Sequence, residues 1–165
     1  NKISKGSLIE LADVGCGYGA FAQYIKTHNP KIKIRYTGYD ISPDLIAECN
    51  SKLSEPWTHF KLGNQPNSTT MFTVMSGTHN LAVTTNLNLW EKHVYNSLLK
   101  CWNKTSKAMI FNLQIASKSW ISKNKIYYAE MMKTLDMCVS NFGPTKVITH
   151  EDLPTDATFL VKKLQ

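Results

Sequence analysis

Residues 12–20 read Ala-Asp-Val-Gly-Cys-Gly-Tyr-Gly-Ala, and this stretch decides the fold of the chain. A short apolar run precedes its glycines, namely Leu8, Ile9, Leu11 and Val14. The run predicts a buried strand, and helical spacing of apolar residues follows the glycines at Ala20, Phe21, Tyr24 and Ile25. The three alternating glycines are therefore predicted to form the turn between a strand and a helix.

A second strand and a second helix are predicted after this unit. The apolar run Ile32, Ile34, Tyr36, Gly38 and Tyr39 ends in Asp40, which lies 25 residues beyond Gly15. Nucleotide-binding βαβ folds place an acidic ribose ligand about 20 residues past the glycines. Ser42-Pro43-Asp44 then supplies an N-cap, a proline at the first helical position and an early acid. This order predicts a site for a ligand that contains a ribose.

Two other interpretations of the turn are open. A Gly-x-Gly-x-Gly turn also fits a tight turn in any α/β domain. A dinucleotide oxidoreductase would carry its third glycine at position 20, but Ala20 stands there and the third glycine is Gly19. Asp13 lies two residues before the first glycine, where its charge repels a pyrophosphate and attracts a ligand with a free ammonium. The sequence thus favours a cationic adenosyl ligand over a dinucleotide.

Residues 11–25, LADVGCGYGAFAQYI, resemble the first motif of the class I S-adenosylmethionine-dependent methyltransferases. Residues 37–46, TGYDISPDLI, resemble the second motif of that family. The resemblance implies that the methionine end of S-adenosyl-L-methionine is held by Asp13, Gly15, Cys16, Gly17 and Gly19. It also implies that Asp40 binds the ribose hydroxyls and that Ile41 lies against the adenine.

Two further stretches extend the resemblance. FKLGNQP at 60–66 has Asn64 where the third family motif usually has an aspartate, and the carbonyl of Asn64 can accept a hydrogen bond from the adenine amine. MFTVMSGTHNL at 71–81 fits the fourth strand and the loop beneath the methyl group, which places Ser76 at the cofactor. Together with Trp90, IFNL at 110–113 and a helix start at Tyr127-Tyr128, this stretch resembles a poorly characterised bacterial subgroup of small-molecule methyltransferases.

The remaining sequence predicts a single domain over residues 1–165. Helices are expected at 86–103 and 127–142, a buried strand at 108–113, and two final strands at 146–149 and 157–164. We expect a three-layer Rossmann-like methyltransferase fold with a seven-stranded, mostly parallel sheet, helices between its first five strands and a C-terminal antiparallel β-hairpin. Relatives of this kind often carry N-terminal helices that close over the site, and we expect native sequence of that kind to be absent from this chain.

Charge and cysteine content restrict the partners and the compartment. The net charge is +7, and residues 101–150 hold seven lysines, so we expect attraction to an anionic small acceptor or to nucleic acid. Arg35 is the single arginine, and no Asn/Asp-Pro-Pro-aromatic motif follows the fourth strand, which disfavours a nucleic-acid substrate. Four widely spaced cysteines predict free thiols and no metal site. Without a signal peptide or a membrane-spanning run, the sequence predicts a cytoplasmic protein.

Methyl transfer requires alignment of the acceptor, and it requires a base only where the acceptor loses a proton. We expect His79, in the loop after the fourth strand, to be this base; a hydrogen-bonding loop histidine is the alternative. Asn80, Asn112 and Tyr128 are expected to contact the acceptor. The predicted function is S-adenosylmethionine-dependent methylation of an oxygen or nitrogen of a small molecule. The alternatives are a cofactor-binding domain or subunit of a larger enzyme without catalysis of its own, and an RNA or DNA methyltransferase.

Overall fold

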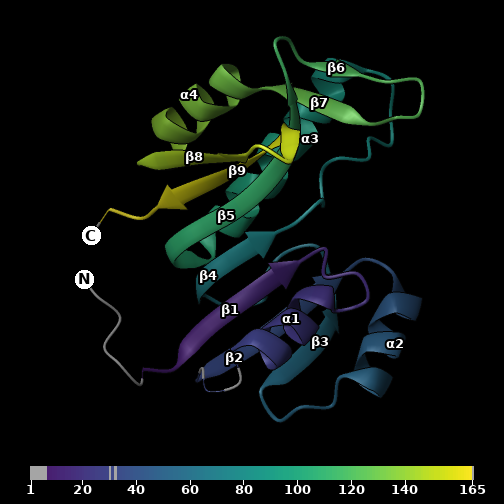
Figure 1. The fold of residues 1–165 in the computed structure, drawn as a ribbon, viewed down its shortest axis with the longest axis vertical. Helices are drawn as coiled ribbons and strands as arrows, with labels where there is room; N and C mark the ends of the chain where they lie inside the picture. The colour runs from purple at the N-terminus through teal and green to yellow at the C-terminus, as the bar shows by residue number, and fades with distance from the viewer. Residues whose placement is uncertain (1–6, 30, 32, 165) are drawn as a thin grey trace.

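A single sheet runs through the chain, whose computed structural model describes residues 7–29, 31 and 33–164 (Figure 1). Ile32 of the second predicted strand lies outside these residues. The elements are, in order, β1 (Ile9–Val14), α1 (Ala20–His28), β2 (Ile34–Asp40), α2 (Pro43–Lys52), β3 (Thr58–Leu62), β4 (Thr70–Met75), α3 (Leu87–Asn103), β5 (Thr105–Ala116), β6 (Trp120–Ile121), β7 (Tyr127–Glu130), α4 (Met131–Asn141), β8 (Thr145–His150) and β9 (Leu153–Lys162).

The strand order places β1 and β4 side by side at the middle of the sheet, where the direction of the chain across the sheet reverses. The strands follow the order β3-β2-β1-β4-β5-β7-β6, and β9 pairs with β5 and with β8. Strand β1 is parallel to β2 on one side and to β4 on the other. The chain therefore moves outward in opposite directions from β1 and β4, and open α/β sheets bind their ligands beyond the carboxyl ends of the strands at such a switch point.

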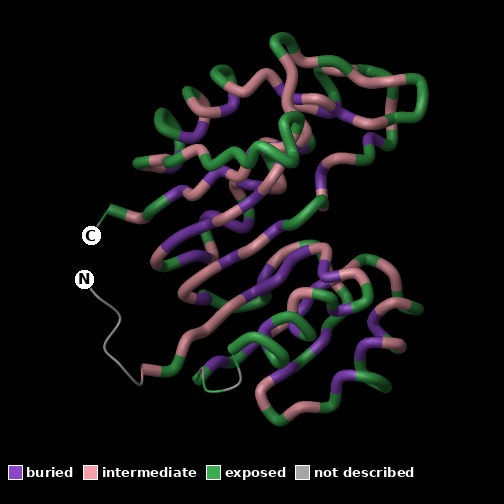
Figure 2. The backbone as a smooth tube through the Cα atoms, viewed as in Figure 1, coloured by how far each residue is buried: buried purple, intermediate pink, exposed green. Residues whose placement is uncertain are grey.

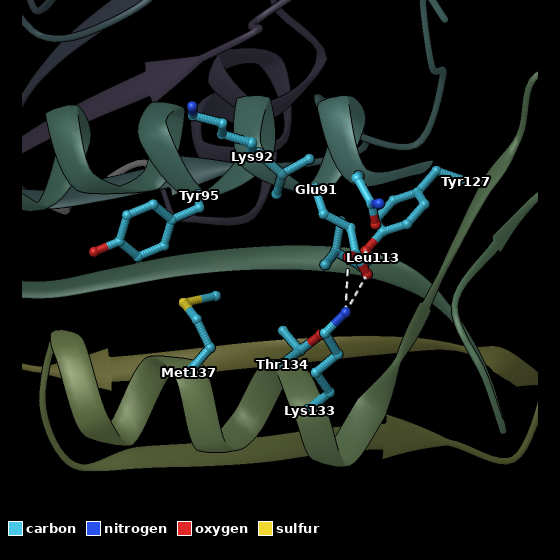
Figure 3. Close-up of a pocket in the computed structure, with 10 residues that line it drawn as sticks. Glu91, Lys92, Tyr95, Leu113, Tyr127, Lys133, Thr134 and Met137 are labelled. Atoms are coloured by element: carbon cyan, nitrogen blue, oxygen red, sulfur yellow. Dashed lines mark hydrogen bonds and ion pairs between the residues drawn. The ribbon is translucent and has the colours of Figure 1, made fainter. Parts of the chain in front are cut away.

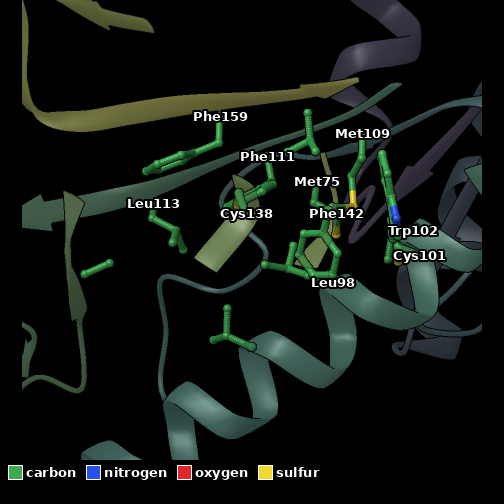
Figure 4. Packing of buried hydrophobic residues seen from close by; sticks show 14 of the residues in the cluster. Met75, Leu98, Cys101, Trp102, Met109, Phe111, Leu113, Cys138, Phe142 and Phe159 are labelled. Carbon is green, nitrogen blue, oxygen red and sulfur yellow. The ribbon is translucent and has the colours of Figure 1, made fainter. Parts of the chain in front are cut away.

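Two hydrophobic clusters cover the two faces of the sheet. Helices α1 and α2 contribute Ala22, Ile25, Ile46 and Cys49 to one cluster. Helices α3 and α4 contribute Leu98, Cys101 and Cys138 to the other, in which Phe111 stacks on Phe159 with ring centroids 5.1 Å apart (Figure 4). Because successive residues of a strand point to opposite faces, each strand can contribute to both clusters. Figure 2 shows buried residues concentrated on the central strands. These layers agree with the expected three-layer fold.

The predicted N-cap and first proline of α2 are confirmed, and α3 matches the helix expected at 86–103. Ser42 caps α2, since its Oγ accepts a hydrogen bond from the N–H of Leu45 at 3.4 Å, and Pro43 is the first helical residue. Helix α3 begins directly after Asn86, whose Oδ1 accepts from the N–H of Leu89 at 3.1 Å. Both caps satisfy backbone donors that a helix start leaves free.

Three predictions about the architecture are wrong in detail. No helix joins β3 to β4, because the loop 63–69 is too short for the dozen or so residues of a crossover helix. The helix predicted at 127–142 begins only at Met131, since Tyr127 to Glu130 alternate between buried and half-buried as the parallel strand β7. The described residues form nine strands instead of seven, because β6 and β7 add a short pair beyond β5. Among the same residues, no helix has the length and apolarity needed to cross a bilayer.

Two leucines of α3 provide a matched test of the packing. Leu98 is fully buried between the helix and the sheet, whereas Leu89 is 60% exposed. We predict that Leu98→Ala lowers the free energy of unfolding by about 2–5 kcal/mol, because it removes buried methyl groups and leaves a cavity. Leu89→Ala should change it by less than about 1 kcal/mol. Urea unfolding of both variants measures the two values, and equal losses would contradict this packing.

Candidate functional site

The glycine turn between β1 and α1 has a backbone that only glycine adopts readily. Gly15, Gly17 and Gly19 have φ angles of 77°, 54° and 75°. A Cβ added to Gly15 would lie 2.6 Å from Oγ1 of Thr78, so this glycine permits close contact with the loop after β4. A Cβ added to Gly17 would meet nothing within 4 Å. Gly17 therefore borders open space at the end of β1, where a ligand can approach the backbone.

The carboxylate of Asp40 fixes this turn from the end of β2. Its Oδ2 accepts the N–H of Gly17 at 3.0 Å, and its Oδ1 accepts the N–H of Ser42 at 3.0 Å. Each carboxylate oxygen can accept two hydrogen bonds, so one acceptor position on each oxygen is left. A half-buried carboxylate with two such positions suits a pair of neighbouring hydroxyls, as on a ribose.

The rim beside Asp40 is apolar and exposed. Ile41 follows β2, and Leu62 ends the neighbouring strand β3; both side chains are exposed. Asn64 lies two residues beyond β3 and is exposed as well. An apolar rim with an amide nearby fits a flat heteroaromatic ring with polar edges, and contact of Ile41 and Asn64 with adenine stays a prediction.

Asp13, near the end of β1, is buried and is not exposed at the glycine turn. It is 3% exposed, and the hydroxyl of Tyr36 on β2 donates a hydrogen bond to its Oδ2. Burial raises the pKa of Asp13 to about 6; the Tyr36 hydrogen bond lowers it, and the charge of Asp40 raises it. In this conformation Asp13 is hydrogen-bonded to Tyr36 in the interior, and its expected contact with the methionine end stays a prediction.

Two buried thiols line the inner side of the turn. The Sγ of Cys49 donates to the carbonyl of Gly17 at 3.2 Å, and Cys16 contacts the same carbonyl at 3.9 Å. Burial raises the pKa of Cys16 to about 12, so the thiol is neutral and has no nucleophilic role near pH 7. Cys49 was not expected here, because nothing in the local sequence links α2 to the glycine turn.

The loop after β4 closes the other side of the turn. Ser76 and Gly77 are exposed directly beyond β4, which puts Ser76 at the same edge as the glycine turn. The hydroxyl of Thr78 donates to the carbonyl of Val14 at 2.8 Å. Together with the space left by Gly15, this bond holds the β4 loop against the end of β1, and sequence analysis did not identify it.

The expected catalytic base, His79, lies in the interior. It is 2% exposed, and its Nε2 is 2.9 Å from the hydroxyl of Ser97 on α3. Burial, together with a smaller effect of the neighbouring His93, lowers its pKa to about 4. A general base must come within hydrogen-bond reach of the proton it removes. Because it is buried, His79 does not meet this condition in the present conformation. Its hydrogen bond with Ser97 links the β4 loop to α3.

The expected acceptor residues lie on β5 or beside its carboxyl end. Asn112 accepts the N–H of Gly77 at 2.7 Å and donates to Oδ2 of Asp156 at 2.8 Å. Asn80 accepts the N–H of Gln114 at 3.2 Å. Tyr128, paired with Gln114 in the sheet, stacks on Trp120. Asp156 of β9 joins Asn112 from one side of β5, whereas Tyr128 of β7 lies on the other side. No local motif reveals the pairing of β9 with β5.

A hollow of about 350 Å³ lies between α3 and α4 on the opposite face of β5 (Figure 3). Leu113, Tyr95 and Met137 give it apolar walls. At one end Nζ of Lys133 lies 2.8 and 2.7 Å from the two carboxylate oxygens of Glu91. None of its lining residues belongs to the glycine turn, β2 or the β4 loop, so the hollow is separate from the candidate site.

Comparisons with known proteins agree with this geometry. A family model described as a methyltransferase domain matches residues 11–107. Rv1506c of Mycobacterium tuberculosis (strain ATCC 25618 / H37Rv), which carries a provisional methyltransferase name, is 25% identical over 156 residues, covering 93% of this chain and 92% of that protein.

Solved structures share the fold. Magnesium protoporphyrin IX methyltransferase (ChlM) from Synechocystis PCC 6803, solved with bound SAM, has a TM-score of 0.68 at 13% identity over 98% of this chain and 74% of its own. A pericyclic reaction enzyme has a TM-score of 0.72 at 11% identity over 100% of this chain and 45% of its own. The expected Rossmann-like methyltransferase fold is therefore confirmed.

Two buried groups, Asp13 and His79, predict opposite effects of pH on stability. The pKa of Asp13 rises on folding from 3.8 to about 6, so its contribution is full below pH 3.8 and is lost as the pH rises through 6. The pKa of His79 falls from 6.5 to about 4, so its contribution is full above pH 6.5 and is lost as the pH falls through 4. Each shift corresponds to about 3 kcal/mol, and in the wild type the two trends oppose each other.

We predict that single substitutions separate these trends. Relative to the wild type, Asp13→Asn should gain stability as the pH rises from 4 to 7, and His79→Gln should lose it over the same interval. Urea unfolding at several pH values measures both differences. If neither difference varies with pH, the pKa shifts of Asp13 and His79 given above are wrong.

Proposed function

This chain belongs to the class I S-adenosylmethionine-dependent methyltransferases, through the methyltransferase-domain model that matches residues 11–107, and we propose that it methylates an oxygen or nitrogen of a small molecule. The observation that carries the proposal is the open space beside Gly17, next to a carboxylate that retains acceptor positions. S-adenosyl-L-methionine, the cofactor of this family, supplies a methyl group already activated on a sulfonium.

The chain's own residues fit that cofactor. The two remaining acceptor positions of Asp40 suit the ribose hydroxyls, and the exposed side chains of Ile41 and Leu62 suit the adenine. Helix α1 starts at the turn without a side-chain cap, so its first backbone N–H groups face the space where a ligand carboxylate would lie. The methionine end would then lie along Gly15, Cys16, Gly17 and Gly19, with Ser76 opposite.

Alignment of the acceptor is the main task left for the protein. The reacting atom must lie in line with the methyl group at about 3 Å, and such positioning alone removes a large part of the barrier. Asn112 links the β4 loop to Asp156, so polar groups are fixed next to the edge where the methyl group is expected. Because His79 is buried, we do not assign it the proton transfer.

Support for a small-molecule acceptor comes from the neighbours and from the surface. The related structure of ChlM is named for methylation of magnesium protoporphyrin IX. Lys118, Lys123 and Lys125 flank β6 on the described surface, which supports an anionic group on the acceptor outside the reacting centre. The pericyclic reaction enzyme shares this fold, so fold alone does not define the reaction, and direct measurement of cofactor binding is needed.

We predict that S-adenosylmethionine and S-adenosylhomocysteine bind to the purified chain and that NAD does not. Asp40→Asn should weaken binding of both adenosyl ligands by about 10- to 100-fold, because a charged acceptor of hydrogen bonds is lost and an NH₂ group is turned toward a backbone N–H. Isothermal titration calorimetry measures the three ligands with wild type and variant.

Asp44→Asn is the matched control. Asp44 lies in the first turn of α2, four residues from Asp40, and its side chain is exposed. It loses the same charge near the same edge, so its affinity for S-adenosylmethionine should stay within about threefold of wild type. Equal weakening in both variants would indicate a general effect of charge and would contradict the ribose assignment.

A further inference from the structure

Helices α3 and α4 cover the same face of β5 and leave a hollow of about 350 Å³ between them (Figure 3). Pockets for small molecules range from about 300 to 1,000 Å³. The hollow is at the lower end of that range, so it has room for a ligand with a single ring. Its lining residues come from α3, β5, β7 and α4, and none of them belongs to the glycine turn, β2 or the β4 loop. A ligand bound here would therefore leave the candidate cofactor site free.

Most of the hollow has apolar walls. Leu113 of β5 lies between the helices, and Val94, Tyr95 and Met137 line the sides (Figure 3). The ring of Tyr95 offers a flat surface to another ring, and the unbranched side chain of Met137 adapts to the shape of a ligand. A buried water needs about two to four polar partners, which these walls do not provide. An apolar ring is therefore a better occupant of this part than water.

Three polar side chains meet at one end of the hollow, namely Glu91 on α3, Tyr127 on β7 and Lys133 on α4 (Figure 3). The Nζ of Lys133 lies 2.8 and 2.7 Å from the two oxygens of Glu91, and the hydroxyl of Tyr127 donates to Oε1 of Glu91 at 3.5 Å. Burial, with a smaller effect of the charge of Glu91, raises the pKa of Tyr127 to about 12, so its hydroxyl is neutral near pH 7. The polar end thus has one negative charge, one positive charge and no net charge.

This polar end retains both a donor and an acceptor of hydrogen bonds. An ammonium has three N–H donors, and Lys133 directs two of them to Glu91. The hydroxyl oxygen of Tyr127 can accept two hydrogen bonds, of which Ser119 supplies one. Both groups adjoin Oε1 of Glu91, so they lie close to each other. A single ligand hydroxyl can therefore donate to Tyr127 and accept from Lys133.

The closed ion pair disfavours a charged ligand. A carboxylate bound to Lys133 would lie beside Glu91, whose side chain is only 20% exposed, and an ammonium bound to Glu91 would lie beside Lys133. In both cases two like charges would share a partly buried site. Lys92 also lines the hollow, but Figure 3 shows its ammonium directed away from the ion pair. A neutral polar group fits this end best.

We propose that the hollow between α3 and α4 is a second ligand site, and that it binds a small neutral molecule with one aromatic ring and a hydroxyl, such as a phenol. The ring packs over Leu113 between Tyr95 and Met137. The hydroxyl donates to Tyr127 and accepts from Lys133. This site is independent of the cofactor site, so the proposal does not rest on the proposed function.

Three probes with the same ring test this site without turnover. 4-Ethylphenol is neutral, 4-ethylbenzoate carries a carboxylate and 4-ethylbenzylamine carries an ammonium. We expect 4-ethylphenol to bind the wild-type chain at least about tenfold more tightly than either charged probe at pH 7, measured by calorimetry and by the NMR shift of the Met137 methyl group. Added S-adenosylhomocysteine should leave this affinity within about threefold. No shift of Met137, equal affinities of the three probes, or competition with S-adenosylhomocysteine would overturn the proposal.

Breaking the ion pair should change which head group is preferred. Glu91→Gln leaves the charge of Lys133 unpaired, so 4-ethylbenzoate should bind about tenfold more tightly than it binds the wild type. Lys133→Gln leaves the charge of Glu91 unpaired and should have the same effect on 4-ethylbenzylamine. Lys92→Gln is the matched control, since it removes the same charge from a group directed away from the pair, and it should keep the wild-type order. An unchanged order in all three variants would refute the role of the ion pair.

Two methionines of α4 test where the ring binds. Met137→Trp puts a larger side chain into the hollow and should weaken binding of 4-ethylphenol by at least about tenfold. Met132 lies on the same helix, is 54% exposed and does not line the hollow, so Met132→Trp should leave the affinity within about threefold. Urea unfolding checks that both variants are folded. Equal effects of the two substitutions would contradict binding in the hollow.

Discussion

Two hydrogen bonds from backbone N–H groups to the carboxylate of Asp40 fix the glycine turn and the start of α2 to the end of β2. One comes from Gly17 in the turn after β1, and the other comes from Ser42 at the cap of α2. A charged acceptor with two backbone donors is fixed more firmly than a neutral one. The glycine turn, the start of α2 and the end of β2 are therefore held together by one side chain, and the carboxylate that orients the turn is also the group that we propose for the ribose.

Alternation along β5 separates core side chains from polar ones. Met109, Phe111 and Leu113 are buried in the core with α3 and α4, while Asn112 and Gln114 between and after them form the polar network. If the polar and the apolar side chains shared one face, amides and a carboxylate would lie in the core, where unpaired polar groups are costly. The same register allows β9 to contribute Phe159 to the core and Asp156 to the opposite face.

The sequence predicted well what depends on neighbours in the chain. The strand, glycine turn, helix and capping signals from β1 to α2 are local, so their positions and the place of Asp40 follow from spacing. Burial of His79 and the meeting of Asn112 with Asp156 depend on how α3 and β9 pack, and no local pattern encodes these contacts. The strand β7 was mistaken for a helix because its four residues are too few to distinguish the two periods.

The residues that we propose for the cofactor and the residues of the polar network come from different parts of the chain. The groups we propose for the cofactor lie mostly between residues 13 and 64, within one parallel unit, whereas the polar network around Asn112 joins residues 77, 112, 114 and 156 across the β4 loop, β5 and β9. Under the proposed function, substitutions in this network would affect the acceptor without altering the hydrogen bonds of Asp40. A fold organised in this way can keep one cofactor and exchange acceptors, which is consistent with the wide chemistry of the structures that share it.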